Sequence, residues 1–143
     1  MNMMISYQEL VRTFPMAFVS FSALADVGQY LSDFASAKST SKSYSQLISK
    51  NKLPAWVKSG GTSTPSTEVT VAGKKYIALS GCKPHSCPEQ NIAVLYSPDS
   101  GDIHGVFSDF NAEKNRETLT WLNVDPIDSN AMKNALFNRL YGN

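Results

Sequence analysis

Short strand-like segments separated by turn signals dominate the middle of this 143-residue chain. They are rich in β-branched and aromatic residues, and their apolar positions alternate, which is typical of β-strands. The first two flank Ala72-Gly73 and predict a hairpin, and a second tight turn is expected at residues 98–102. The Gly- and Ser-rich residues 59–65 are expected to form a flexible turn region. The expected strands are residues 68–71, 75–79, 91–96, 103–107 and 118–122.

Apolar residues at helical spacing flank the predicted strands. Residues 30–34 begin this pattern, a helix from Ser43 has to end before Pro54, and Pro126 opens a final helix. A chain of this length can bury the core of one domain without covalent staples. The order predicts an α+β fold, in which an antiparallel sheet of about five strands has helices packed on one face.

The N-terminal part of the chain carries a candidate export signal. Residues 14–24 form an apolar run, and Ala23-Leu24-Ala25 matches a signal-peptide cleavage site. Arg12 is the only basic residue ahead of the run, which is atypical. We expect residues 1–25 to be a signal peptide and residues 26–143 to form a single mature domain. The alternative is an amphipathic N-terminal helix packed on that domain.

The charge balance excludes two classes of partner. A net charge of +1 and a pI near 7.7 leave no electrostatic footprint for nucleic acid or for an anionic membrane. No apolar run reaches the roughly 18 residues that are needed to span a bilayer. We therefore expect no nucleic acid and no membrane among the partners of the mature protein.

The hexapeptide Cys82-Lys83-Pro84-His85-Ser86-Cys87 brackets four residues between the only two cysteines. If the thiols join, they close a small ring with Pro84 and His85 near its tip. Closing so short a loop stabilises a fold by only about 2 kcal/mol, so presenting a side chain is the better reason for the ring. The alternatives are two reduced cysteines, or a zinc site that combines both cysteines with His85 and His104. We expect a disulfide-closed display loop at the end of a strand, with no metal.

Motifs of catalysis are missing from the sequence. It contains no Gly-rich phosphate loop, no HExxH and no Gly-x-Ser-x-Gly elbow. The paired carboxylates Asp99 with Asp102 and Asp125 with Asp128 fall in expected turns and helix caps, where such residues are ordinary. His85 alone lacks the partner that an acid–base mechanism requires. We therefore expect a protein without enzymatic activity and without a cofactor.

The hexapeptide resembles the Cys-Lys-Pro-His-Asp-Cys loop of the Ivy family, which are periplasmic inhibitors of vertebrate (C-type) lysozyme. Other segments resemble the family in the same order, and the likeness runs from about residue 44 to about residue 140. These segments are Lys52-Leu53-Pro54-Ala55-Trp56-Val57 with Gly60-Gly61, Ile92-Ala93-Val94-Leu95-Tyr96-Ser97 and Leu119-Thr120-Trp121-Leu122-Asn123-Val124.

The resemblance implies a mechanism. Ivy proteins have a five-stranded antiparallel sheet with helices on one face, and they insert the disulfide-closed loop into the lysozyme cleft. Here Cys82 and Cys87 would close the ring, His85 would hydrogen-bond the two catalytic carboxyl groups, and Lys83 and Pro84 would shape and flank it. The resemblance further implies the periplasm of a Gram-negative cell as the location and C-type lysozyme as the protein partner. It is also compatible with a homodimer.

Ser86 departs from the family pattern, which has aspartate at this position. Serine brings no charge to the neighbouring histidine, so potency or target can differ. One alternative is therefore an Ivy-like paralogue that controls endogenous lytic transglycosylases or another muramidase. A second is a periplasmic metal- or ligand-binding module that uses His85 with His104.

Overall fold

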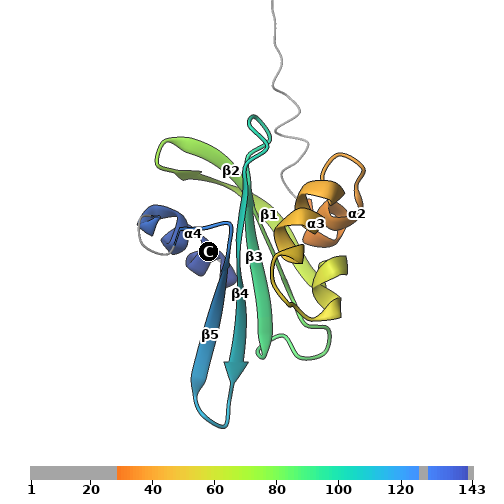
Figure 1. Cartoon of the computed structure of the whole chain (residues 1–143), viewed down its shortest axis with the longest axis vertical. Helices are drawn as coiled ribbons and strands as arrows, with labels where there is room; N and C mark the ends of the chain where they lie inside the picture. The colour runs from red at the N-terminus through yellow and green to blue at the C-terminus, as the bar shows by residue number, and fades with distance from the viewer. Residues whose placement is uncertain (1–28, 126–128, 142–143) are drawn as a thin grey trace, which may run out of the picture.

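The structure is a computed structural model that describes residues 29–125 and 129–141. Helices precede and follow five consecutive strands (Figure 1). The elements are α2 (Leu31–Ser36), α3 (Ser41–Ser49), the 3-10 helix η1 (Ala55–Ser59), β1 (Thr62–Val71), β2 (Lys74–Cys82), β3 (Gln90–Tyr96), β4 (Ile103–Asn111), β5 (Arg116–Leu122) and α4 (Asn130–Leu140).

The five strands form one antiparallel sheet in the order β1-β2-β3-β4-β5, so each strand pairs with the next along the chain. The predicted hairpin is confirmed, since Val71 pairs with Lys74 across Ala72 and Gly73. Both turn residues have positive φ, 52° at Ala72 and 83° at Gly73, as the tight turns of β-hairpins require. The α+β class and the five-stranded antiparallel sheet are thus as the sequence predicts.

The helices lie on both faces of the sheet, and the prediction of a single helical face is wrong in this respect. Helices α2 and α3 (orange) and η1 cover one face, and α4 (blue) lies across the other (Figure 1). The central strands explain the difference, because residues 76–79 of β2 and 92–95 of β3 are buried without a break. Apolar side chains on both faces of a strand each need cover from water.

Each face has its own hydrophobic core. Under α2, α3 and η1, the sheet contributes Ile77, Leu79, Ile92, Val94, Phe107 and Leu122. Under α4, it contributes Val71, Tyr76, Ala78, Ala93, Leu95 and Val106, which pack with Leu136 of the helix. The alternating residues of β2 and β3 therefore divide between the two cores and hold both strands rigidly in the middle of the molecule.

Strand β1 begins earlier than the sequence indicates. Residues 62–65, predicted as a turn region, already belong to β1, and Thr62 pairs with Cys82. The chain reverses just before, at Gly60 and Gly61, whose φ values are 86° and 62°. A shift of register between Thr64 and Thr67 accommodates the intervening proline within this edge strand.

Two predictions fall on parts of the chain outside the described residues. They are the signal peptide with its cleavage site, within residues 1–25, and the opening of the last helix at Pro126. Within residues 29–125 and 129–141, every helix is too short or too polar to cross a lipid bilayer.

Candidate functional site

The hexapeptide forms the start of the β2–β3 connection, and its cysteines are joined. Cys82 is the last residue of β2, and it is bonded to Cys87 with their Cα atoms 4.7 Å apart. The predicted disulfide is present, and its sulfur atoms are bonded to each other rather than free as thiols or zinc ligands. A covalent ring therefore extends from the end of the sheet at the point where β2 and β3 are held side by side.

A tight turn inside the ring presents the histidine. The Ser86 backbone N–H donates to the Lys83 carbonyl over 2.9 Å, which places Pro84 and His85 at the two central positions. His85 has a φ of 67°, and a positive φ after a proline is the pattern of a type II turn. Proline fixes its own φ, and histidine is among the non-glycine residues that adopt positive φ more readily than most. The His85 side chain is exposed at the tip.

The second half of the connection returns the chain to the sheet. The Glu89 N–H donates to the Ser86 carbonyl over 3.0 Å and closes a second turn. The Glu89 carbonyl then accepts from the Phe110 N–H of β4 over 2.8 Å. Lys83 and Glu89 also form an ion pair of 3.7 Å, but both side chains are exposed, so its contribution is small. Backbone hydrogen bonds therefore fix the shape of the connection.

Two further hydrogen bonds close the base of the ring. The Lys83 N–H donates to the Gln90 carbonyl over 3.0 Å, which extends the β2–β3 pairing by one step. The Asn91 side-chain amide donates to the Cys87 carbonyl over 2.9 Å and ties the second cysteine to β3. Both ends of the ring are thus held to the sheet as well as to each other.

The Gly60–Gly61 turn packs against the end of β2, at the base of the ring. A β-carbon at Gly61 would come within 2.6 Å of the Trp56 ring and closer still to the Cys82 carbonyl oxygen. A β-carbon at Gly81 would overlap the Gly60 carbonyl oxygen. Only glycines therefore allow these two backbone segments to approach so closely.

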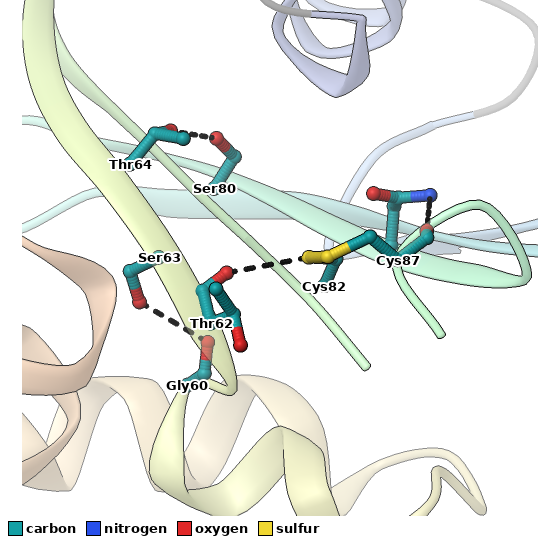
Figure 2. Close-up of a disulfide and its surroundings, with 8 residues drawn as sticks. Gly60, Thr62, Ser63, Thr64, Ser80, Cys82 and Cys87 are labelled. Carbon is teal, nitrogen blue, oxygen red and sulfur yellow. Dashed lines mark hydrogen bonds between the residues drawn. A yellow bond between two sulfur atoms is a disulfide. The ribbon is translucent and has the colours of Figure 1, made fainter. Parts of the chain in front are cut away.

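Trp56 braces the ring from the helical side. Its indole N–H donates to the Gln90 side-chain oxygen over 2.8 Å, at the start of β3. Nearby, the Cys82 sulfur lies 3.5 Å from the Thr62 carbonyl oxygen, drawn as a dashed line in Figure 2. Because a disulfide sulfur carries no proton, this is a packing contact. The sequence did not predict this support of the ring by Trp56, although the segment with Trp56 and Gly60-Gly61 is one of those that resemble the family.

His104 lies away from the ring and does not join His85. His104 of β4 pairs with Leu95 of β3. Its Nδ1 lies 2.6 Å from the Asn123 carbonyl oxygen, and because a carbonyl can only accept, this nitrogen is the donor. The ring end of β4 is at Ser108, four residues further along, or roughly 13 Å at the rise of a strand. A metal site shared by the two histidines, which the sequence left open, is therefore wrong. In the described part of the chain, no three His, Cys, Asp or Glu side chains cluster as metal ligands.

A hollow of about 780 Å³ lies between α2, α3 and η1. Its lining includes Lys42, Lys52 and Lys58. The described lining contains no carboxylate, histidine or cysteine.

Comparison with known proteins places these features in a family. The family model described as "Inhibitor of vertebrate lysozyme (Ivy)" matches residues 40–138. The chain is 40% identical over 124 residues to the inhibitor of vertebrate lysozyme of Escherichia coli strain K12, which covers 87% of this chain and 79% of the relative. The same figures hold for the protein of that name from Escherichia coli O157:H7. A third relative of that name, from Pseudomonas aeruginosa strain PAO1, is 31% identical over 58 residues, which is 40% of this chain and 38% of the relative. The match spans the ring, the sheet and most of α4, and the chain therefore belongs to the Ivy family of inhibitors of vertebrate lysozyme.

Proposed function

We propose that this protein inhibits C-type lysozyme by inserting the ring closed by Cys82 and Cys87 into the active-site cleft of the enzyme. The observation that carries the proposal is the position of His85, exposed at the tip of a ring whose base is fixed in the sheet. The relatives named as inhibitors of vertebrate lysozyme support it, and the family is one of inhibitors rather than enzymes.

The chemistry of the imidazole suits the cleft of a glycosidase. A retaining glycosidase holds two carboxyl groups about 5 Å apart, one protonated and one ionised. A neutral imidazole carries one donor and one acceptor on opposite edges of its ring. His85 would donate to the ionised carboxylate and accept from the protonated carboxyl group, which occupies both groups that the enzyme needs for catalysis.

The ring also reduces the cost of binding. Ordering a flexible interface loop costs about 0.5–1.5 kcal/mol for each side chain that is immobilised. Here the disulfide, the Ser86-to-Lys83 turn bond and the Gly60–Gly61 packing fix the loop before it meets the enzyme. Lys83 and Pro84 have the supporting roles of starting the turn and setting its direction.

Ser86 does not alter this geometry. Its backbone N–H and carbonyl make the two turn bonds, and every residue except proline offers the same groups. The serine therefore preserves the ring while leaving out the charge that the family aspartate carries. A change of target enzyme is the consequence to test, and lytic transglycosylases are the alternative targets of the same ring.

We further propose that residues 1–25 direct export and that the mature domain of residues 26–143 acts in the periplasm. A disulfide in a chain with only two cysteines supports an oxidising compartment. The homodimer stays a prediction.

The test is the residual activity of a C-type lysozyme on cell walls with increasing amounts of the oxidised protein. Loss of activity near equal amounts of the two proteins, unchanged by excess EDTA, is the expected result. Full lysozyme activity under an excess of the protein would overturn the proposal. Inhibition of a lytic transglycosylase in the same series, without inhibition of lysozyme, would identify the paralogue.

A further inference from the structure

A groove of about 500 Å³ runs beside the ring on the face of the sheet that carries α4. Cys87 and Pro88 form one wall of the groove, and Phe110 of β4 and Leu140 of α4 supply much of its apolar surface. Since Cys87 is two residues from His85, their Cα atoms are at most about 7.6 Å apart. A protein surface that receives His85 therefore also reaches this groove.

The described lining of the groove contains one carboxylate, that of Glu117. Glu117 of β5 lies opposite Phe110, and both the Ser108 hydroxyl and the Tyr141 hydroxyl donate to its Oε2 atom. The three groups come from β4, β5 and the end of α4, so the packing of the fold brings them together. Among the described residues, Glu117 Oε1 has no hydrogen-bond partner, and no Lys or Arg lines the groove.

The two hydroxyl groups orient the carboxylate, because both donate to the same oxygen atom. The hydrogen bond from Tyr141 to Glu117 raises the pKa of Tyr141 to about 12, so this hydroxyl stays protonated and donating at neutral pH. The buried Ser108 hydroxyl acts as the second donor to the same oxygen. The groove thus combines an oriented, half-buried negative charge with apolar walls.

We propose that the groove is a second anchor of the complex and takes one basic side chain of the enzyme whose cleft receives His85. Lysine and arginine match it, because their aliphatic stems pack on apolar surface while their charged ends reach a carboxylate. Glu117 Oε1 would accept from the basic group, and Phe110 and Leu140 would pack against the stem. This inference rests on the proposed lysozyme inhibition and names a second contact of the same interface.

Glu117→Gln tests the charge with little change of shape. The amide oxygen can still accept from Ser108 and Tyr141, but the negative charge is gone. Binding of C-type lysozyme to the oxidised full chain should weaken about 10- to 50-fold, mainly through faster dissociation. Because a charged pair is screened by salt, the loss of affinity between low and high salt should also be smaller in the variant than in wild type.

Two matched variants separate the charge from other effects. Glu113→Gln removes an exposed carboxylate of the β4–β5 turn, outside the groove, and should leave the dissociation constant within about twofold of wild type. Glu117→Asp keeps the charge and should restore most of the affinity. Thermal unfolding of each variant shows whether it is folded.

The outcomes distinguish the groove from the ring. If wild type binds lysozyme and Glu117→Gln binds with the same affinity and the same salt dependence, the second anchor is wrong and the ring mechanism stands. Weakening by Glu117→Asp as large as by Glu117→Gln, in a folded protein, would likewise exclude a charge contact. If wild type does not bind lysozyme at all, the proposed function fails and the second anchor falls with it.

Discussion

Gly61 lies so close to the carbonyl oxygen of Cys82 that a β-carbon at Gly61 would overlap it. The glycine also has a φ of 62°, a conformation that side-chain-bearing residues adopt at a cost. The position is thus restricted twice, by backbone conformation and by the lack of space under the ring.

Gly61→Ala should destabilise the protein by about 2–4 kcal/mol, because strain at positive φ adds to displacement of the ring base. Gly73→Ala is the matched control, since Gly73 has a φ of 83° but nothing within 4 Å of a β-carbon. Gly73→Ala should lower the free energy of unfolding by only about 1 kcal/mol. Urea unfolding measures both variants, and equal losses would show that the packing against Cys82 contributes nothing.

Removing the disulfide should affect inhibition more than folding. The Cys82→Ser, Cys87→Ser double variant should have a free energy of unfolding about 2 kcal/mol lower than wild type, because so short a loop restricts the unfolded chain only a little. The two hydrophobic cores lie in the body of the sheet, so circular dichroism should stay close to native. Lysozyme inhibition should fall because the freed loop must be ordered on binding. Global unfolding of the variant would mean that the ring is a structural staple.

Arg139 links α4 to the irregular part of β1. The buried guanidinium donates to the Pro65 carbonyl over 2.8 Å and to the Thr64 and Thr67 hydroxyls over 3.2 and 3.3 Å. Arg139→Ala should therefore lower the free energy of unfolding by about 2–4 kcal/mol, since it removes a buried, packed side chain and its charge-assisted hydrogen bonds to β1. The exposed neighbour variant Asn138→Ala should change stability by less than about 0.5 kcal/mol. A similarly small change for Arg139→Ala in urea unfolding would contradict this role.

The pKa of Tyr141 reports on the groove without any partner. The bond to Glu117 raises that pKa to about 12, and Glu117→Gln should return it toward the ordinary value of about 10. The bond stabilises the protonated hydroxyl, so its contribution to stability is complete below about pH 10 and disappears as pH rises to 12. Ultraviolet titration of tyrosinate in wild type and in Tyr141→Phe isolates this group. The difference between the two titrations is the titration of the Tyr141 hydroxyl. If that hydroxyl loses its proton in the same pH range as an ordinary tyrosine, the hydrogen bond to Glu117 is absent.

Much of the fold was predictable because local pattern and burial agree. The alternation of β1 and β2 around Ala72-Gly73 gave the hairpin correctly. The covering of both faces was also readable in principle, since Ile92 and Val94 point to one core and Ala93 and Leu95 to the other. The expectation of one helical face fails there, because apolar residues on both sides of a strand need cover from water on both sides.

The disulfide and the exposed histidine were predictable from six adjacent residues, but their support was not. The Gly61 contact with Cys82 joins residues 21 positions apart. The Glu117 groove draws on β4, β5 and α4, which no local pattern connects. Contacts of this kind depend on sheet register and helix placement, and they become visible only in the folded chain.

The central claim is that the His85 side chain blocks the enzyme. The decisive measurement is residual lysozyme activity against wild type, His85→Ala and His85→Gly. Glycine tolerates the φ of 67° at this position, so His85→Gly removes the imidazole without strain in the turn. His104→Ala, at the other end of β4, is the control and should inhibit like wild type once its folding is verified. Both His85 variants should weaken inhibition by about 2–4 kcal/mol, or about 30- to 900-fold, because they leave buried carboxyl groups of the enzyme unpaired. Potency of His85→Gly equal to that of wild type would contradict the mechanism.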